Sequence, residues 1–240
     1  MENLSYIGLS QQVALQQQMD LIAQNLANMN TPGYKSENPL FTDYLGGDKA
    51  KDKINQVINA RSYRDLSPAS VTQTYNPLDV AISGDGYFAI ASGGGTKYTR
   101  DGSFALNAAR EIVTANGETV QSDGGGAIVV PQDANKITIT ATGDVSTEDG
   151  ILAKLKIVNF ADQQRMTHVG NNLLDSGGQA ETPIEAPRVI QGAVEGSNVN
   201  PVLEMTRMTE VTRMFQMAQS MQQTDHDRQR RMIESLSKTV

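Results

Sequence analysis

Few residues of this chain could carry chemistry, and their spacing argues against an active site. Cysteine is absent, which removes a thiol nucleophile, a disulfide framework and a cysteine-based zinc site. The two histidines, His168 and His226, lack histidine neighbours at helical ligand spacing, and a Ser-His-Asp triad would have no nucleophile elbow. The sequence therefore predicts no catalytic, cofactor-binding or metal-ligating residue.

Glycine-rich turns are the other candidates. Residues 93–95 and 124–126 are glycine triplets without the Lys-Ser/Thr of a phosphate-binding loop, so flexible hairpin tips are favoured. Asp101 with Gly102, and the turn over residues 83–86, hold oxygens near glycine as calcium loops do. The twelve-residue ligand pattern with its final glutamate is missing, so β-turns are the favoured interpretation.

The composition excludes further classes. A net charge of −7 disfavours nucleic-acid binding, which needs a basic face. No stretch reaches the roughly 18–20 apolar residues that span a bilayer, so direct membrane insertion is not expected. Glu2 stands where a cleaved signal would have a basic start. We expect a chain that stays in the cytoplasm or leaves by a route that does not read such a signal.

Two helix-competent ends enclose a strand-like middle. Helices are predicted over residues 5–29 and from 201 to about 237, the second started by an Asn200 cap and Pro201. Apolar residues at alternating spacings of three and four form the predicted assembly interface: Leu15, Met19, Ile22, Leu26 and Met29 in the first helix, Met208, Val211, Phe215 and Ala218 in the second. Such narrow stripes need a partner helix, in the same molecule or in a neighbour.

The predicted fold class is α+β with a central antiparallel β domain. Short apolar runs alternate with turn signals in the middle, and Ile151, Ala153, Leu155 and Ile157 alternate with lysines as in a half-buried strand. The predicted division is as follows: 1–33 an amphipathic helix, 34–76 an extended connecting arm, 77–185 the β domain, 186–200 a linker, and 201–240 a second amphipathic helix. This layout is typical of a part that polymerises rather than one that catalyses.

Five blocks of the sequence resemble the signatures of bacterial flagellar rod and hook proteins, and they fall in the order of that family. They are QNLANMNTPGYK (24–35), LDVAISGDGYFAI (78–90), YTRDGSFALN (98–107), GNNLL (170–174) and QGAVEGSNVNPVLEMTRM (191–208). The motif residues are Asn25, Leu26, Ala27, Asn28, Thr31, Gly33, Tyr34, Asp79, Gly84, Gly86, Thr99, Arg100, Asp101, Gly102, Ser197, Asn198, Val199, Glu204 and Met205.

The resemblance implies a structural, non-enzymatic subunit of the basal-body rod, without a cofactor. Its terminal helices would form a coiled-coil layer, and its β domain would set contacts between subunits. The implied partners are other copies, other rod proteins and the flagellum's own type III export apparatus. The implied location is the periplasm-spanning rod, reached without a cleaved Sec signal. We expect both ends to be poorly ordered in the free monomer and to fold on incorporation.

Alternatives stay open within and outside the family. The length and compact middle are most like the proximal-rod member, which is a paralogue of the distal-rod protein, but a distal-rod or hook-type protein is an alternative. Family members usually have glycine where Arg110 stands; arginine at positive φ is strained, which leaves open a different hairpin here. A secreted β-domain enzyme acting on cell wall is the alternative from another class, and its activity should survive deletion of residues 1–30.

Overall fold

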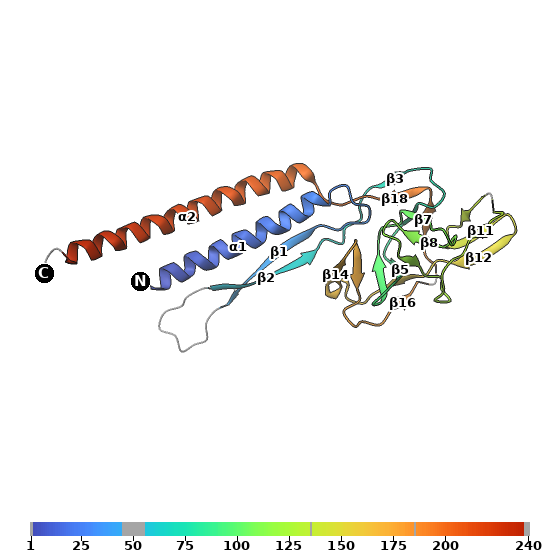
Figure 1. Cartoon of the computed structure of the whole chain (residues 1–240), viewed down its shortest axis with the longest axis horizontal. Helices are drawn as coiled ribbons and strands as arrows, with labels where there is room; N and C mark the ends of the chain where they lie inside the picture. Colours follow the sequence, from blue (N-terminus) through green and yellow to red (C-terminus); the bar gives the residue numbers. More distant parts are fainter. Residues whose placement is uncertain (1, 45–55, 135, 185, 238–240) are drawn as a thin grey trace. The chain divides into compact units, whose positions relative to one another are not determined.

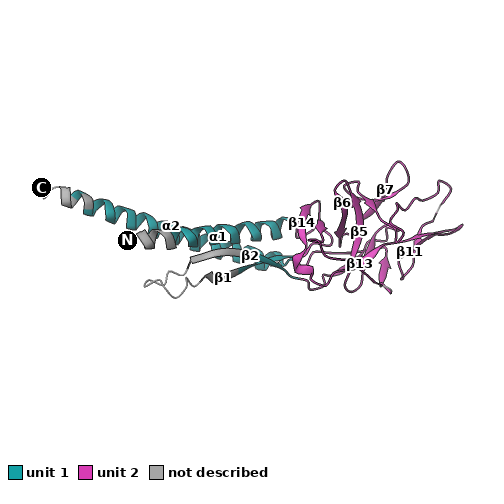
Figure 2. Cartoon of the chain, turned by 90° about the horizontal axis from the view of Figure 1, so that it is seen from below, with its two compact units in different colours: residues 1–27, 36–65, 199–240 teal, residues 28–35, 66–198 magenta. Residues whose placement is uncertain are grey.

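The computed structural model describes residues 2–44, 56–134, 136–184 and 186–237. The chain divides into two compact units, each assembled from segments that are distant in the sequence (Figure 2). Unit 1 contains residues 1–27, 36–65 and 199–240, and unit 2 contains residues 28–35 and 66–198. The predicted α+β class and the central antiparallel β domain are confirmed.

Unit 1 consists of two long helices and a β-hairpin. α1 (Glu2–Ala27) and α2 (Pro201–Ser237) lie side by side and antiparallel, so that Gly8 near the start of α1 lies against Gln222 in the second half of α2 (Figure 1). β1 (Glu37–Tyr44) pairs antiparallel with β2 (Gln56–Arg64), and this hairpin packs beside α1. Neither of these helices, over its described length, is apolar enough to cross a lipid bilayer.

Local sequence sets the helix boundaries. The side-chain oxygen of Asn200 accepts a hydrogen bond from the Leu203 amide (3.2 Å), so α2 starts with the predicted cap and Pro201 follows it. The predicted helix over residues 201–237 is confirmed. α1 ends at Ala27, where a turn begins, and the prediction that Met29 continues the helical stripe is wrong. The turn lies directly before Pro32. It is closed by a hydrogen bond that the Thr31 amide donates to the Asn28 carbonyl (3.1 Å).

The main sheet of unit 2 is antiparallel. Its strand order is β14-β15-β6-β5-β9-β8-β7, and β13 pairs with both β5 and β16. The strands of this sheet are β5 (Tyr87–Ser92), β6 (Gly95–Thr99), β7 (Phe104–Leu106), β8 (Ile112–Thr114), β9 (Thr119–Val120), β13 (Ile157–Asn159), β14 (Thr167–Gly170), β15 (Leu173–Asp175) and β16 (Thr182–Pro183). A short 3-10 helix, Gln163–Arg165, lies between β13 and β14 in the sequence.

Three smaller ladders complete unit 2. β10 (Thr138–Ile139), β11 (Asp144–Thr147) and β12 (Gly150–Lys154) form one of them. The other two pair β17 (Val189–Gln191) with β4 (Val80–Ile82), and β18 (Ala193–Glu195) with β3 (Val71–Gln73). The last two ladders join residues near the C-terminal helix to the start of the β domain.

The core of unit 2 lies on both faces of β5. Side chains alternate along a strand, so Phe88 and Ile90 point into one apolar cluster, where the Phe88 ring meets Phe104 edge-on at 5.1 Å between centroids. Tyr87 points to the opposite face, into a second cluster with Phe160 at 6.3 Å. Both faces of β5 are therefore covered by apolar side chains, and β5 is the central strand of unit 2.

Two segments predicted as connectors are strands. The sequence predicts an extended arm over residues 34–76, but the structure has the β1–β2 hairpin and β3 there. The predicted linker over residues 186–200 contains β17 and β18. Neither segment alternates strongly in hydropathy, and pairing with strands distant in sequence decides their conformation.

Arg110 adopts a left-handed backbone conformation, which is unusual for a residue other than glycine. Arg110 has a φ of 64°, and its amide donates to the Asn107 carbonyl (2.9 Å). Its guanidinium donates to the carbonyls of Val130 (3.3 Å) and Pro131 (2.7 Å). These bonds offset the strain of positive φ, so the different geometry considered from the sequence is not found.

Candidate functional site

The first candidate surface is the apolar seam between α1 and α2. Leu15, Ile22 and Val211 are buried in this seam. Partly buried side chains pack against them, namely Met19, Met208, Phe215 and Ala218. All predicted assembly residues except Leu26 and Met29 therefore meet here. The sequence left open whether the partner helix lies in the same molecule, and in this structure each terminal helix covers the stripe of the other.

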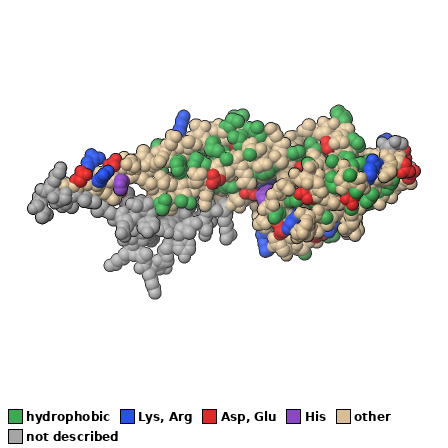
Figure 3. All heavy atoms as spheres, in the orientation of Figure 1, with side chains coloured by type: hydrophobic (Ala, Val, Ile, Leu, Met, Phe, Trp, Pro, Cys, Tyr) green, Lys and Arg blue, Asp and Glu red, His purple; other side chains and the backbone are tan. Residues whose placement is uncertain are grey.

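A second apolar stripe on α2 is left uncovered by α1. Leu203, Met214, Met217 and Met221 are all exposed, Met217 by 63%. At about 100° per residue they lie roughly 60–120° round the helix from buried Val211. Figure 3 shows hydrophobic side chains gathered on the visible face of the helical unit. Methionine side chains repack readily against varied partners, so this stripe suits a contact surface.

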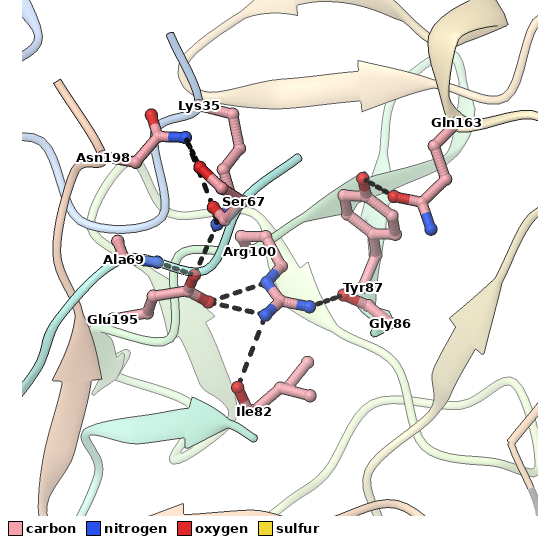
Figure 4. Close-up of polar contacts among 10 residues, drawn as sticks. All are labelled: Lys35, Ser67, Ala69, Ile82, Gly86, Tyr87, Arg100, Gln163, Glu195 and Asn198. Atoms are coloured by element: carbon pink, nitrogen blue, oxygen red, sulfur yellow. Dashed lines mark hydrogen bonds and ion pairs between the residues drawn. The ribbon is translucent and has the colours of Figure 1, made fainter. Parts of the chain in front are cut away.

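The second candidate is a buried charge cluster in unit 2 formed by Lys35, Arg100 and Glu195. Lys35 Nζ lies 2.6 Å from Glu195 Oε1, and Arg100 NH2 lies 2.7 Å from Glu195 Oε2. The three side chains are 7%, 8% and 2% exposed. Figure 4 shows the carboxylate between the two cations. Backbone groups complete the cluster: the Ala69 amide donates to Glu195, and Arg100 donates to the Gly86 carbonyl.

The electrostatics of this cluster favour the ionised carboxylate. Burial by itself disfavours the charged form of Glu195, but Arg100 and Lys35 outweigh it and hold the pKa of that carboxyl below its usual value. Two buried cations then share one anion, and Lys35 also donates to the Ser67 carbonyl and Arg100 to the Gly86 carbonyl. An arrangement without a free carboxylate, nucleophile or base fixes chain segments rather than transforming a substrate.

The charge cluster ties the segment over residues 28–35 to the β domain. The Gly33 amide donates to the Glu195 carbonyl (2.8 Å), and the Asn198 amide donates to the Tyr34 carbonyl (3.4 Å). Gly33 has a φ of 70°, and an added Cβ would lie 2.5 Å from the backbone of Arg100. Only glycine fits this position without displacing the Arg100 backbone. With Gly86, whose carbonyl accepts from Arg100, four of the resembling blocks thus meet at one place in unit 2.

Other motif residues of the β domain close its turns. Asp79 accepts hydrogen bonds from Thr74 (2.6 Å) and Asn76 (2.9 Å). Asp101 accepts from the Ser103 amide (2.9 Å), and burial raises the pKa of this carboxyl. A Cβ on Gly102 would lie 1.7 Å from the Val80 carbonyl oxygen, so a side chain is excluded there. Thr99 donates to the Asn172 carbonyl, and Gly84 and Gly86 lie in the turn before β5.

The motif residues of unit 1 include two buried polar side chains. Asn25 exchanges two hydrogen bonds with the backbone of Glu37, at 2.8 and 2.9 Å, and so fixes the start of β1 against α1. Glu204 is buried in the first turn of α2, where negative charge suits the helix dipole. The remaining motif residues have simpler settings: Leu26 and Ser197 are half-buried, Val199 is buried, Ala27 and Met205 are exposed, and Asn28 and Thr31 close the turn after α1.

Sequence reasoning missed Lys35 and Glu195 as site residues, although both stand in quoted blocks. Each has an uncharged residue on either side in the sequence, but Glu37 follows Lys35 two positions later, so the local signal is weak. His168 stacks on Tyr34 with ring centroids 6.3 Å apart, and His226 is exposed on α2. Among the residues that the structure describes, no group of three or more His, Asp or Glu could hold a metal ion.

Three segments of the chain match families of flagellar axial proteins. Residues 6–35 match the family "Flagella basal body rod protein", a range that covers most of α1 and the turn after it. Residues 81–147 match "Flagellar hook protein FlgE/F/G D1 domain", within the β domain. Residues 190–235 match "Flagellar basal body rod FlgEFG protein C-terminal", which includes β18 and most of α2. These matches, which extend from the first helix to the last, indicate the class of flagellar rod and hook proteins.

Proteins of similar sequence identify the family within this class. The chain is 32% identical over 243 residues to the flagellar basal-body rod protein FlgF of Caulobacter vibrioides, covering 99% of both chains. It is 34% identical to FlgF of Mesorhizobium japonicum, with 90% of both covered, and 34% identical to FlgG of Bacillus subtilis, with 88% of this chain and 90% of the relative covered. The chain belongs to the flagellar basal-body rod protein family.

Membership of this family sets the function class. The chain is a structural subunit of the flagellar basal-body rod and associates there with other rod proteins. It is not an enzyme, because the family is structural. The alternative of a β-domain enzyme acting on cell wall is therefore wrong.

Proposed function

We propose that this chain polymerises through its terminal helices into the part of the rod that spans the periplasm, where the helices of neighbouring copies form a coiled-coil layer. The observation that carries this proposal is the exposed stripe of Leu203, Met214, Met217 and Met221 beside the α1–α2 seam. Apolar surface of this kind is costly to leave in water, and adjacent helices would cover it.

Within the rod, a proximal position fits the chain better than a distal one. Alignment with the FlgF protein of Caulobacter vibrioides covers 99% of both chains, whereas alignment with FlgG of Bacillus subtilis covers 88% of this chain and 90% of the relative. The proximal-rod assignment rests on the length and the compact middle of the chain, and the full-length correspondence with FlgF agrees with that length. A distal-rod or hook-type role is the alternative.

The small core of unit 1 supports export in an unfolded state through the flagellar type III apparatus. Only three apolar side chains of the described helices are fully buried in the α1–α2 seam: Leu15, Ile22 and Val211. Burying them contributes roughly 1.5–3 kcal/mol each, against roughly 1–2 kcal/mol per residue for ordering the backbone. A seam this small would leave the helices to gain most of their order from neighbours in the assembled rod.

A charge placed on the exposed stripe tests the proposal. Met217→Asp should abolish swimming and remove the chain from isolated basal bodies, because a carboxylate would be buried between copies. The matched control is Gln219→Asp, which adds the same charge at an exposed position of the same helix outside the stripe. Near-ultraviolet circular dichroism of the purified variants checks that the β domain is folded in both. Normal swimming of the Met217→Asp strain, with the variant present in basal bodies, would refute assembly through this stripe.

A further inference from the structure

All the sulfur of this chain is in methionine. The sequence has ten methionines and no cysteine, so oxidation of thioethers is the sulfur redox chemistry that it offers. Oxidation turns the flexible, apolar methionine side chain into a polar sulfoxide, and an exposed side chain reacts more readily than a buried one. The distribution of methionines between buried and exposed positions therefore decides where an oxidant acts.

Three methionines lie on the exposed stripe of α2. Met217 and Met221 are 63% and 68% exposed, and Met214 is 38% exposed. Met221 follows Met217 by four positions and Met214 by seven, so the three side chains line one side of the helix. A sulfoxide on any of them changes the surface that the proposed function places between neighbouring copies.

Other methionines provide comparisons within the same chain. Met166 is 2% exposed in the second apolar cluster of unit 2. Met19 is partly buried in the α1–α2 seam, where its sulfur accepts a hydrogen bond from the Thr212 hydroxyl (3.9 Å). Met205 is 52% exposed, but its position in α2 is roughly 120–180° round the helix from the three stripe methionines. An oxidant can therefore reach Met205 about as easily as the stripe, although Met205 lies outside it.

We propose that Met214, Met217 and Met221 form a site of oxidative modification by peroxides, and that a sulfoxide at this site keeps the chain out of the rod. The inference rests on the proposed function, which covers the stripe with neighbouring copies. In the reaction the thioether sulfur attacks one oxygen of hydrogen peroxide, the O–O bond breaks, and the second oxygen leaves as water. The sulfur is oxidised and the peroxide is reduced.

The timing of oxidation decides its effect. The sulfoxide oxygen is a hydrogen-bond acceptor that apolar neighbours cannot satisfy, so burying it between helices is unfavourable. A chain oxidised before assembly is therefore rejected, whereas a chain already in the rod has its stripe covered and is protected. Methionine sulfoxide reductases reverse the modification, so a rejected chain is recoverable.

Peptide mass spectrometry of cells grown with hydrogen peroxide tests the site. In one culture, the unassembled chain is compared with the chain from isolated basal bodies. Sulfoxide at Met217 and Met221 should be about tenfold rarer in basal bodies, the discrimination that one buried acceptor without a donor provides. Sulfoxide at Met205 should be equally frequent in both pools, and Met166 should stay unoxidised. Equal stripe sulfoxide in the two pools, or equal exclusion of chains oxidised at Met205, would overturn the inference.

A variant without sulfur on the stripe gives a second test. Met214→Leu, Met217→Leu and Met221→Leu together keep the stripe apolar and remove its thioethers. Peroxide should leave the amount of this triple variant in basal bodies unchanged, whereas the unsubstituted chain and the matched control Met205→Leu should both fall. An equal fall of the triple variant would overturn the inference. The comparison of the two pools needs no substitution, so it decides the inference even where the triple variant assembles poorly.

Peroxide added to isolated basal bodies separates this inference from the proposed function. Met217 and Met221 should react about tenfold more slowly there than in the purified free chain, because neighbouring copies cover them. Equal rates would refute assembly through the stripe and the inference with it. Slow reaction in basal bodies, together with equal stripe sulfoxide in the two cellular pools, would overturn the inference and leave the proposed function standing.

Discussion

The buried charge cluster of unit 2 allows a sharp test of how the chain holds its β domain together. Glu195→Gln keeps the shape of the side chain but removes the only anion between Lys35 and Arg100. Breaking a buried pair by removing one partner costs about 3–5 kcal/mol, because an uncompensated charge stays buried. With a slope of about 2 kcal/mol per M urea, the unfolding midpoint should fall by about 1.5–2.5 M.

The assay is urea unfolding of the full chain followed by near-ultraviolet circular dichroism, because Tyr87 and Tyr98 lie in the core of unit 2. Glu181→Gln is the control, since it breaks the less buried pair with Lys156 and should cost about 1 kcal/mol or less. Equal midpoints for the Glu195→Gln and Glu181→Gln variants would show that the cluster contributes nothing particular to stability.

The stability lost in the Glu195→Gln variant should depend on pH. The pKa of Glu195 is lowered in the folded chain, so its contribution is complete above the unfolded value of about 4.3 and is lost as pH falls through the folded value. The stability gap between the unsubstituted chain and Glu195→Gln should therefore be constant above about pH 5 and narrow below about pH 4. A gap that widens on acidification would contradict the assignment of the ionised form.

Three further perturbations separate the parts of the chain. Ile22→Asp should abolish motility yet leave unit 2 folded, because Ile22 is buried in the seam of unit 1. The control is Val13→Asp, which changes an exposed residue of the same helix and should leave cells motile. Swim plates measure motility, and near-ultraviolet circular dichroism of the tyrosines reports whether unit 2 is folded. Gly33→Ala should destabilise unit 2 by about 1–3 kcal/mol or more, because the added Cβ would clash with the backbone of Arg100. The control is Gly84→Ala, whose Cβ would meet open space, so that it carries only the strain of positive φ. The urea midpoints of the two variants measure the difference. Amide exchange in the free monomer should be fast over residues 5–29, and strong protection there would contradict ordering on incorporation.

Local signals in the sequence were enough to place the helices. The cap at Asn200 and the proline after it fix the start of α2, and the alternating spacing from Leu15 to Ile22 identifies the face that packs. These features depend on neighbours within one or two helical turns, so a single sequence contains them. Which helix packs against that face depends on the tertiary structure. The sequence indicated that a partner helix is needed but not which one it is.

Strand pairing was harder to predict than the helices, because the register of a strand is set by residues distant in the sequence. Ile151 was predicted to share a buried face with Leu155, but it is 75% exposed while Leu155 is buried. The ladder between β11 and β12 shifts register between Val145 and Ser146, which breaks the alternation along the strand. The β1–β2 hairpin escaped prediction for a related reason, since its two strands are polar and are joined by a long connection.

The resembling blocks at the two ends of the chain each cross from one unit to the other. The first block divides between the units: residues 24–27 end α1 in unit 1, and residues 28–35 belong to unit 2. The last block divides in the same way, with residues 191–198 in unit 2 and residues 199–208 in unit 1. Each block must therefore end or start a helix and also satisfy contacts in a β domain within a few residues. Helix caps, a glycine that no other residue can replace and buried charges meet both demands within these two segments.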